Sequence, residues 1–513
     1  MGQRGAAGHR TNIRCRLRTG DGYNRRMHPD TTASITDAMH ALAYVGDLSM
    51  GQPTDHSLRT AWLAGRIADA VGCSEVDIAA ARQVALLRWS GCTANAPEFS
   101  ALIGDDVGGR ADMLSQKPAG PSPAPMAALK PHDLQLLTQI HCEVSGDIAG
   151  MLRVPAAVEH ALRTIFAPYD GNAGLDSAPH RGVPDSVHMV ALASDIEILG
   201  RVHGLAHALG IIAGKSGKAY PASWADIATD RAAQWLEVLD RDESWQASLT
   251  FGALAGSDAV PLELLADVID LKLPWMTGHS RRVAEAARGA AARMGLDGAA
   301  QLRCYRAALV HGIGRAAVPN LVWNETGRLS PAAREQIRLA PYWTGRAAAR
   351  VGKLAGDADI GSYAGERLDG SGAFRACAGA AIPVEGRIVA AAAAWVALRS
   401  ARPWRAAMDI DGARAVLEKE AASGRFDTAA VQAVCAPGTS SPSPLDGQEK
   451  MQLTEREIDV FKGISLGLTN KEVARALAIS PSTVRTHVEN VFRKLGCTTR
   501  AAATLKASTL RLL

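Results

Sequence analysis

Residues 469–488 read Thr469-Asn-Lys-Glu-Val-Ala-Arg-Ala-Leu-Ala-Ile-Ser-Pro-Ser-Thr-Val-Arg-Thr-His-Val488 and contain the starts of two helices. Thr469 and Glu472 have the spacing of a capping box, in which the hydroxyl accepts a hydrogen bond from a free backbone N–H and the acid bonds back to the cap. Thr454 and Glu457, further upstream, have the same spacing and predict a third helix start. Ser480 precedes Pro481, which places an N-cap residue directly before a proline at the first helical position. Two short helices separated by a tight turn predict a helix-turn-helix.

The second of these helices has one apolar face and one polar face. Val484, Val488, Val491 and Leu495 recur at helical spacing, so the opposite face is free to enter a major groove with its N-terminus first. We expect Arg485 and Thr486 to meet base edges. The residues expected to contact phosphates are Lys471, Ser482, Thr483 and Lys494. The predicted DNA contacts are Lys471, Ser482, Thr483, Arg485, Thr486, His487, Glu489 and Lys494.

The wider run 453–506 resembles the LuxR-type (NarL-type) DNA-binding domain of bacterial transcription regulators. The resemblance rests on Leu453-Thr-Glu-Arg-Glu457, Asn470-Lys-Glu-Val-Ala474 and Ser482-Thr-Val-Arg-Thr-His-Val488. It implies a four-helix module whose last helix, at about 499–510, can dimerise. Residues 451–513 carry 10 Lys and Arg against 5 Asp and Glu, whereas the rest of the chain carries 46 against 47. The positive charge therefore lies where phosphate contacts need it.

The composition bounds the rest of the chain. A length of 513 residues exceeds what one hydrophobic core supports, so we expect several domains, and scarce aromatic residues with abundant alanine favour helices. Eight scattered cysteines without a Cys-x-x-Cys pair indicate reduced thiols of a cytoplasmic protein, and no apolar run is long enough to span a bilayer. Residues 1–34 are basic and without periodicity, which predicts disorder, and either Met1 or Met27 could be the first residue translated.

The chain before the DNA-binding module contains a weak internal repeat. Residues 55–72 and 278–295 are identical at seven of 18 positions, at an offset of 223, and later segments keep the same order with a drifting offset. This is typical of a tandem repeat with loop deletions. We therefore predict two helical domains, at 35–240 and 250–435. A Pro-, Ser- and Gly-rich linker at 436–450 follows, on which the DNA-binding module at 451–513 can pivot.

The second repeat resembles the HD-GYP branch of the HD phosphohydrolase superfamily. The resemblance rests on Gly278-His-Ser280, Leu309-Val-His-Gly-Ile-Gly314, Glu366-Arg-Leu-Asp-Gly-Ser-Gly372 and Ser400-Ala-Arg-Pro-Trp-Arg405. It implies an all-α bundle with a two- or three-metal centre that hydrolyses a phosphodiester, typically cyclic di-GMP. It also implies that most ligand positions are lost, because the family His and Asp residues fall on Gly312, Ala340, Ala364, Gly365 and Ala393.

Few ligand-like residues are left in either repeat. The second repeat keeps His279 and His311, and two neutral imidazoles without a carboxylate cannot neutralise a metal pair. In the first repeat the family His-Asp pair aligns with Arg88-Trp89, while His56, His141 and Asp195 still occupy ligand-like positions. We expect all five residues to be structural, with no cofactor, no divalent metal and no catalysis in these domains. A composite site shared by the two repeats stays open.

The sequence therefore predicts an all-α protein in which tandem HD-like bundles precede a four-helix LuxR-type helix-turn-helix domain. We expect a transcription regulator whose HD-like domains sense a ligand or a protein, or set the oligomeric state. The expected partners are double-stranded DNA, a second copy of the chain and RNA polymerase, with an effector of unknown identity and no membrane. The alternatives are a metal-dependent cyclic dinucleotide phosphodiesterase tethered to DNA, and a scaffold with constitutive DNA binding.

Overall fold

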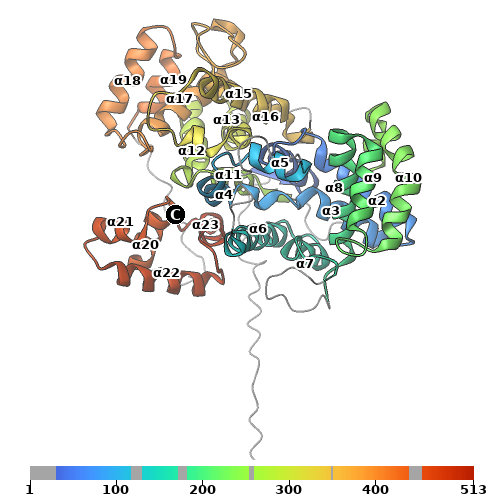
Figure 1. Cartoon of the computed structure of the whole chain (residues 1–513). Coiled ribbons are helices and arrows are strands. Elements are labelled where there is room, and N and C mark those ends of the chain that lie inside the picture. The colour runs from blue at the N-terminus through green and yellow to red at the C-terminus, as the bar shows by residue number, and fades with distance from the viewer. Residues whose placement is uncertain (1–30, 117–129, 171–181, 253–258, 348–349, 438–452) are drawn as a thin grey trace, which may run out of the picture.

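The computed structural model describes residues 31–116, 130–170, 182–252, 259–347, 350–437 and 453–513. Helices make up nearly all of the described regular structure, and one pair of three-residue strands is present in it (Figure 1). The predicted all-α fold class is therefore confirmed. The N-terminal segment up to residue 30 and most of the predicted linker, from residue 438 on, lie outside the described residues. No helix in the described ranges has the length and apolar character needed to cross a bilayer.

The first bundle occupies residues 31–248. Its elements are β1 (Thr32–Ser34), α1 (Ile35–Ser49), α2 (His56–Ala70), α3 (Glu75–Leu87), η2 (Ser90–Cys92), α4 (Ala96–Ile103), α5 (Gly108–Ser115), α6 (Pro131–Leu152), α7 (Ala156–Arg163), α8 (Asp185–His203), α9 (Leu205–Lys215), α10 (Ala222–Arg241) and η4 (Glu243–Ser248).

The second bundle occupies residues 259–435. Its elements are β2 (Ala259–Pro261), α11 (Glu263–Asp270), η5 (Pro274–Met276), α12 (His279–Arg293), α13 (Gly298–Val310), η6 (Ile313–Ala317), α14 (Asn320–Trp323), α15 (Pro331–Ala347), η7 (Gly352–Leu354), α16 (Ala355–Gly361), η8 (Ser362–Gly365), η9 (Gly379–Ala381), α17 (Val384–Leu398), α18 (Ile410–Ala422) and α19 (Thr428–Cys435).

The two bundles repeat each other locally. Helices α2 and α3 begin 223 residues before α12 and α13, which is the offset found in the sequence. A serine at the second position of each leading helix bonds a buried aspartate ten residues earlier: Ser57 Oγ donates to Asp47 (2.6 Å) and Ser280 Oγ donates to Asp270 (2.7 Å). The geometry of the repeat therefore matches its sequence pattern, while the boundaries 35–240 and 250–435 stay a prediction.

The bundles pack into one body. Strands β1 and β2 pair antiparallel, with Ala33 opposite Val260. Beside them, buried Lys272 of the second bundle forms an ion pair with buried Asp106 of the first (2.6 Å), and Asp106 also accepts the backbone N–H of Asn320 (2.6 Å). A buried ion pair is tolerated only when hydrogen bonds satisfy its remaining atoms, so this contact fixes how the two bundles sit.

The C-terminal domain contains α20 (Glu455–Ser465), α21 (Asn470–Ala476), α22 (Pro481–Leu495) and α23 (Arg500–Thr509). Both predicted capping boxes are formed, with Thr454 and Glu457 at the start of α20 and Thr469 and Glu472 at the start of α21. Ser480 caps α22 by accepting the backbone N–H of Thr483 (3.1 Å). The three helix starts are therefore where the sequence predicts them.

This domain does not stand free of the bundles in the structure, as the linker composition led us to expect. Its last helix, α23, lies between the rest of the domain and α6 (Figure 1), and it also contacts α11. One face of α6 supplies Glu143, which accepts hydrogen bonds from the backbone N–H (2.6 Å) and the hydroxyl (2.8 Å) of Thr498. One turn further on, Asp147 pairs with Lys506 (3.2 Å). The domain is therefore held against both bundles.

Candidate DNA-binding surface and HD centres

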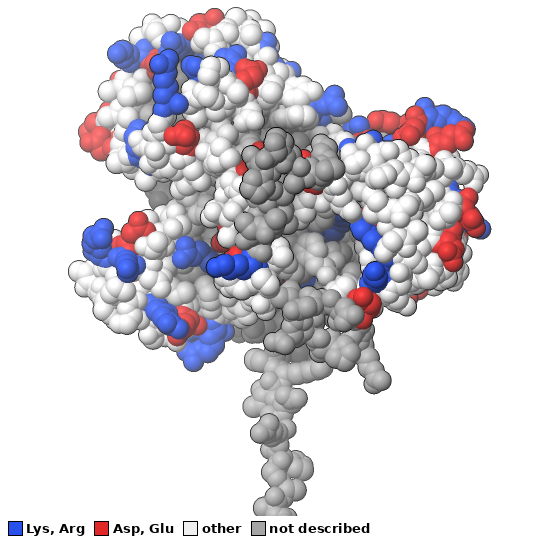
Figure 2. Space-filling model, viewed as in Figure 1, with Lys and Arg blue, Asp and Glu red and all other residues white. Residues whose placement is uncertain are grey.

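The predicted recognition helix, α22, is open to solvent on its polar face. Val484, Val491 and Leu495 are buried against the rest of the domain, whereas Ser482, Thr483, Arg485, Thr486 and Glu489 are exposed, as is Lys471 on α21. Figure 2 shows Lys and Arg side chains gathered on the lobe that α20 to α22 form in Figure 1. The surface therefore has the shape and the charge for phosphate contacts, and the individual DNA contacts stay predictions.

Several of these side chains already have partners within the domain. Arg485 forms an exposed ion pair with Glu489 (2.8 Å), one turn along the same helix. Lys494 pairs with the capping acid Glu457 (2.7 Å), so in this state its ammonium group ties α22 to α20. His487 is half-buried, and its Nδ1 atom has no hydrogen-bond partner. Arg485 would have to leave Glu489 to read a base edge.

In the second bundle, His311 is fully engaged. Its Nδ1 atom lies 2.5 Å from the carbonyl oxygen of Ala308, so it must carry the proton, and its Nε2 atom then accepts from Arg315 (2.5 Å). Burial and the nearby Arg315 guanidinium lower the pKa of His311 to about 3, so the imidazole is neutral. Arg315 also pairs with buried Asp270 (3.3 Å). A guanidinium therefore occupies the side of His311 from which a metal would be bound.

His279 lies close to His311, with ring centroids 5.9 Å apart, and its buried Nδ1 atom has no hydrogen-bond partner. Burial, followed by repulsion from Arg315 and Arg402, holds the pKa of His279 well below its usual value. Within the described ranges, no three His, Cys, Asp or Glu side chains form a group that could hold a metal ion. The donors in this centre thus do not fit the metal pair that the family resemblance implies.

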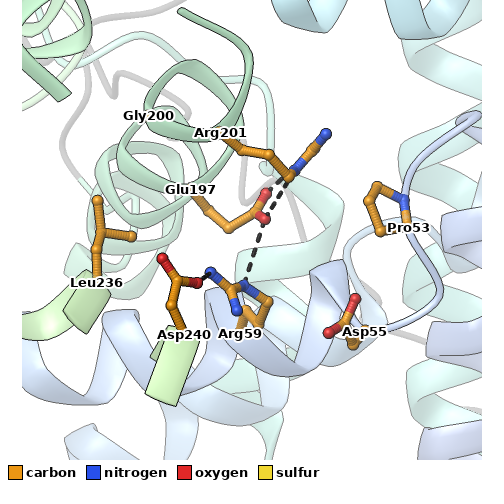
Figure 3. Close-up of a pocket in the computed structure, with 8 residues that line it drawn as sticks. All are labelled: Pro53, Asp55, Arg59, Glu197, Gly200, Arg201, Leu236 and Asp240. Carbon is orange, nitrogen blue, oxygen red and sulfur yellow. Dashed lines mark hydrogen bonds and ion pairs between the residues drawn. The ribbon is translucent and has the colours of Figure 1, made fainter. Parts of the chain in front are cut away.

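In the first bundle, His56 forms a buried pair with Glu197, at 2.5 Å between Nδ1 and Oε2. Burial alone would raise the pKa of Glu197, but His56 and Arg201 outweigh it and hold the pKa at about 2. The carboxylate lies between Arg59 and Arg201 (Figure 3). It borders a cavity of about 420 Å³ lined by Pro53, Asp55, Arg59, Glu197, Gly200, Arg201, Leu236 and Asp240. Because three acids face two arginines there, the cavity has no positive excess.

The other two ligand-like residues of the first bundle have separate partners. His141 Nε2 bonds the carbonyl of Arg88 (2.7 Å), and Asp195 pairs with Lys215 (2.9 Å). The Arg88 guanidinium is buried and donates to Ser194 (2.7 Å) and to a backbone carbonyl. The structure therefore does not bring His56, His141 and Asp195 together as a ligand set, and a guanidinium again occupies the position of a family metal ligand.

Comparison with known families assigns two parts of the chain. The family described as "HD domain" matches residues 263–430, and the family described as "Bacterial regulatory proteins, luxR family" matches residues 451–507. The chain therefore carries an HD domain and, behind it, a LuxR-type helix-turn-helix domain. The assignment of the first bundle to the HD family stays a prediction.

Individual relatives support both parts. The chain is 24% identical over 419 residues to 3′3′-cGAMP-specific phosphodiesterase 3 of Vibrio cholerae, covering 76% of this chain and 91% of the relative. It is 49% identical over 53 residues to the nitrate/nitrite response regulator protein NarP of Escherichia coli, covering 10% of this chain and 25% of the relative. A crystal structure of a cyclic GMP-AMP-specific phosphodiesterase of V. cholerae superposes with a TM-score of 0.57 at 22% identity, over 79% of this chain and 97% of that one.

These comparisons correct one conclusion of the sequence analysis. We expected the HD-like domains not to be catalytic, because so few metal ligands remain. The similarity to a phosphodiesterase over 419 residues contradicts that conclusion and points to an enzyme. The side chains in the second bundle show only that the residues present there are poor ligands for a metal pair. This does not by itself establish the absence of catalysis.

Two arginines that shape the centre of the second bundle are not among the residues predicted from the sequence. Arg315 follows His311 by four residues, a spacing that could have suggested contact within a helical turn. Arg402 was noted only as part of a motif, yet its guanidinium stacks over Trp275, 4.6 Å from the ring centroid. These two positions are far apart in sequence, so no local pattern could have placed them in one cluster.

Proposed function

We propose that this protein is a cytoplasmic transcription regulator whose HD region binds a cyclic dinucleotide and thereby controls how its LuxR-type domain engages DNA. The substrate named for the V. cholerae relative supports the ligand class. The LuxR-type domain supports DNA binding, with RNA polymerase as a further partner of the bound protein.

The observation that carries this proposal is the position of α23. Seven of its ten residues are buried, on a helix that also contacts α6 and α11. If this helix is the surface through which two copies pair, it has to leave the bundles before a dimer can form on a two-fold operator. A ligand shifts the equilibrium between docked and released α23 only as far as its affinities for these two states differ, so the nucleotide has to bind the released state more tightly.

The test measures DNA binding with and without the nucleotide. Fragmented DNA from the source genome is selected on the purified full chain, and the affinity for a recovered site is then titrated at increasing 3′3′-cGAMP or cyclic di-GMP. We expect the nucleotide to change the affinity for DNA about 10-fold or more, which lies within the usual range of coupling free energies between two binding sites. A nucleotide that does not bind, or that binds and leaves DNA affinity unchanged, refutes the proposal.

A second candidate function is hydrolysis of the same nucleotide, favoured by the phosphodiesterase relatives. The chain would then be a DNA-tethered phosphodiesterase. Incubation of the full chain with 3′3′-cGAMP and Mn²⁺ or Fe²⁺, followed by chromatography, reports the linear product. Metal content measured on the same preparation shows whether the rate of hydrolysis rises with the amount of metal bound to the protein.

A further inference from the structure

Three guanidinium groups lie within electrostatic reach of His279 in the second bundle. Arg282 lies on α12, Arg315 in η6 and Arg402 just after α17. Asp270 is the carboxylate that pairs with Arg315, so these three cations exceed it by two charges. Burial, followed by repulsion from Arg315 and Arg282, lowers the pKa of Arg402 to about 10. Cations held this close repel one another, and a bound anion would relieve that repulsion.

Two buried polar atoms of this cluster have no partner. They are one terminal nitrogen of Arg402, NH1, and the Nδ1 atom of His279. A buried donor without a partner costs free energy, and native proteins rarely keep one unless a ligand, an ion or a water satisfies it. The Arg402 nitrogen is always a donor, so it indicates a place in this cationic cluster where an external acceptor binds; His279 Nδ1 is a second donor there in the tautomer that protonates it.

Aromatic rings adjoin the same cluster. The Arg402 guanidinium lies over Trp275, and Trp275 makes an edge contact with Trp404 at 5.7 Å between centroids. Trp404 is 48% exposed, so one face of a large ring is open to solvent beside the guanidinium groups. An exposed aromatic face is a stacking platform for a nucleobase, and guanidinium groups bind phosphate in a bidentate manner.

We propose that Arg282, Arg315 and Arg402 bind a phosphodiester of a cyclic dinucleotide directly, without a divalent metal, while Trp404 stacks on one of its bases. The inference rests on the proposed function and names the residues that hold its ligand. It concerns how the nucleotide is held, whether or not the diester is then cleaved. Guanidinium groups thus take the place that metal ions hold in the family to which the second repeat is similar.

The same site adjoins the DNA-binding domain. Arg282 donates to the carbonyl of Thr277 (3.1 Å). The Thr277 hydroxyl lies 2.9 Å from the carbonyl of Ser465 at the end of α20 and 2.9 Å from that of Pro274, so its proton is shared between the two. Gly467 follows with φ +91°, and a Cβ there would lie 3.0 Å from Pro274. A phosphodiester that draws Arg282 away from Thr277 would loosen this turn, so the nucleotide would weaken the docking of the DNA-binding domain.

The binding test is calorimetry on the full chain in EDTA, with 3′3′-cGAMP, cyclic di-GMP and inorganic phosphate as separate probes. Arg402→Ala should weaken nucleotide binding about 10- to 100-fold, the usual cost of a hydrogen bond to a charged group. Trp404→Ala should weaken the cyclic dinucleotides and leave inorganic phosphate unchanged. Arg399→Ala is the matched control, because that exposed arginine stacks on Trp395 of α17.

The outcomes separate this inference from the proposed function. If the nucleotide binds in EDTA and Arg402→Ala matches the wild type, the arginine site is refuted while the proposed function stands. The same holds if the nucleotide binds only after Mn²⁺ is added. If no cyclic dinucleotide binds under either condition, the proposed function itself falls, and the ligand named here falls with it.

Thr277→Val tests the route to the DNA-binding domain. This change removes the hydroxyl that bonds Ser465 and keeps a side chain of similar size. Because nucleotide binding and domain docking are coupled reciprocally, the undocked variant should bind the nucleotide more tightly than the wild type. Hydrogen exchange at residues 462–468 should then be fast without nucleotide, as it becomes in the wild type when nucleotide is added. Slow exchange that nucleotide does not alter in the wild type would refute the route.

Discussion

At the scale of single residues, two basic side chains of the predicted DNA-binding surface, Arg485 and Lys494, already form ion pairs with acids of the same domain. The Arg485 side chain is 76% exposed and paired with Glu489 one turn away. Such a pair contributes little to stability because solvent screens it, and it lies on the exposed face of α22. If Arg485 reads a guanine, as the sequence predicts, it exchanges this pair for a bidentate contact with the base.

Substitution of Arg485 should separate base reading from phosphate binding. Arg485→Ala should weaken binding to a selected operator about 10- to 100-fold and relax its sequence specificity. Lys471→Ala should weaken operator and random DNA alike and reduce the salt dependence of both. Fluorescence anisotropy titrations on the two DNAs measure this. Equal losses on both DNAs for both variants would contradict the assignment of Arg485.

The buried pair between Lys272 and Asp106 makes a second prediction at this scale. Asp106→Ala should lower the free energy of unfolding by about 3–5 kcal/mol, because it leaves a buried ammonium group without its carboxylate. Denaturant unfolding of the full chain measures the change. Lys272→Met combined with Asp106→Leu should recover part of the loss, and a double variant no more stable than Asp106→Ala would speak against a charge effect.

At the scale of elements, α22 depends on its cap. The Ser480 hydroxyl bonds the backbone N–H of Thr483, which would otherwise be free at the helix start. Ser480→Ala should destabilise the C-terminal domain by about 0.5–2 kcal/mol, and Ser480→Asp should restore most of that, since both Ser and Asp are good caps. Hydrogen exchange within α22 reports the local stability. Equal protection in the alanine variant would show that packing alone holds the helix.

The small side chains of α23 explain why this short helix packs against several neighbours. Its sequence is rich in alanine, and it is capped by Thr499, which bonds the N–H of Ala502 (3.3 Å). Small side chains allow neighbouring helices to approach closely on more than one side. This explains why α23 can be covered by α6 and α11 as well as by its own domain, and why it is an element whose exposure could be switched.

At the scale of the whole molecule, polar contacts of α6 add to the packing of α23 that holds the C-terminal domain against the bundles. Glu143→Lys should weaken docking for two reasons. It removes the carboxylate that accepts two hydrogen bonds from Thr498, and it places a positive charge near the positive charge of Lys506. We expect a larger radius of gyration by small-angle scattering and faster tryptic cleavage at α23. Glu237→Lys on α10 is the matched control, because Glu237 is exposed and pairs with Arg241. An unchanged radius with unchanged cleavage would refute the docking role of Glu143.

Features that depend on residues close together in the chain could be predicted from the sequence. The caps at Thr454, Thr469 and Ser480, the buried and exposed faces of α22 and the repeat of α2–α3 in α12–α13 were all predictable. Hydrogen bonds within one turn and apolar spacing along one helix involve residues close in the chain, so their pattern is legible in the sequence.

Only the tertiary structure decided which distant groups meet. The Arg315 guanidinium on His311, the approach of Arg402 to Trp275 and the docking of Thr498 on Glu143 join residues that local patterns do not link. The family resemblance pointed to His279 and His311, whose ring centroids lie 5.9 Å apart, but it could not show that arginine side chains lie beside them. Such contacts depend on how whole helices pack, because packing fixes the directions in which their side chains point.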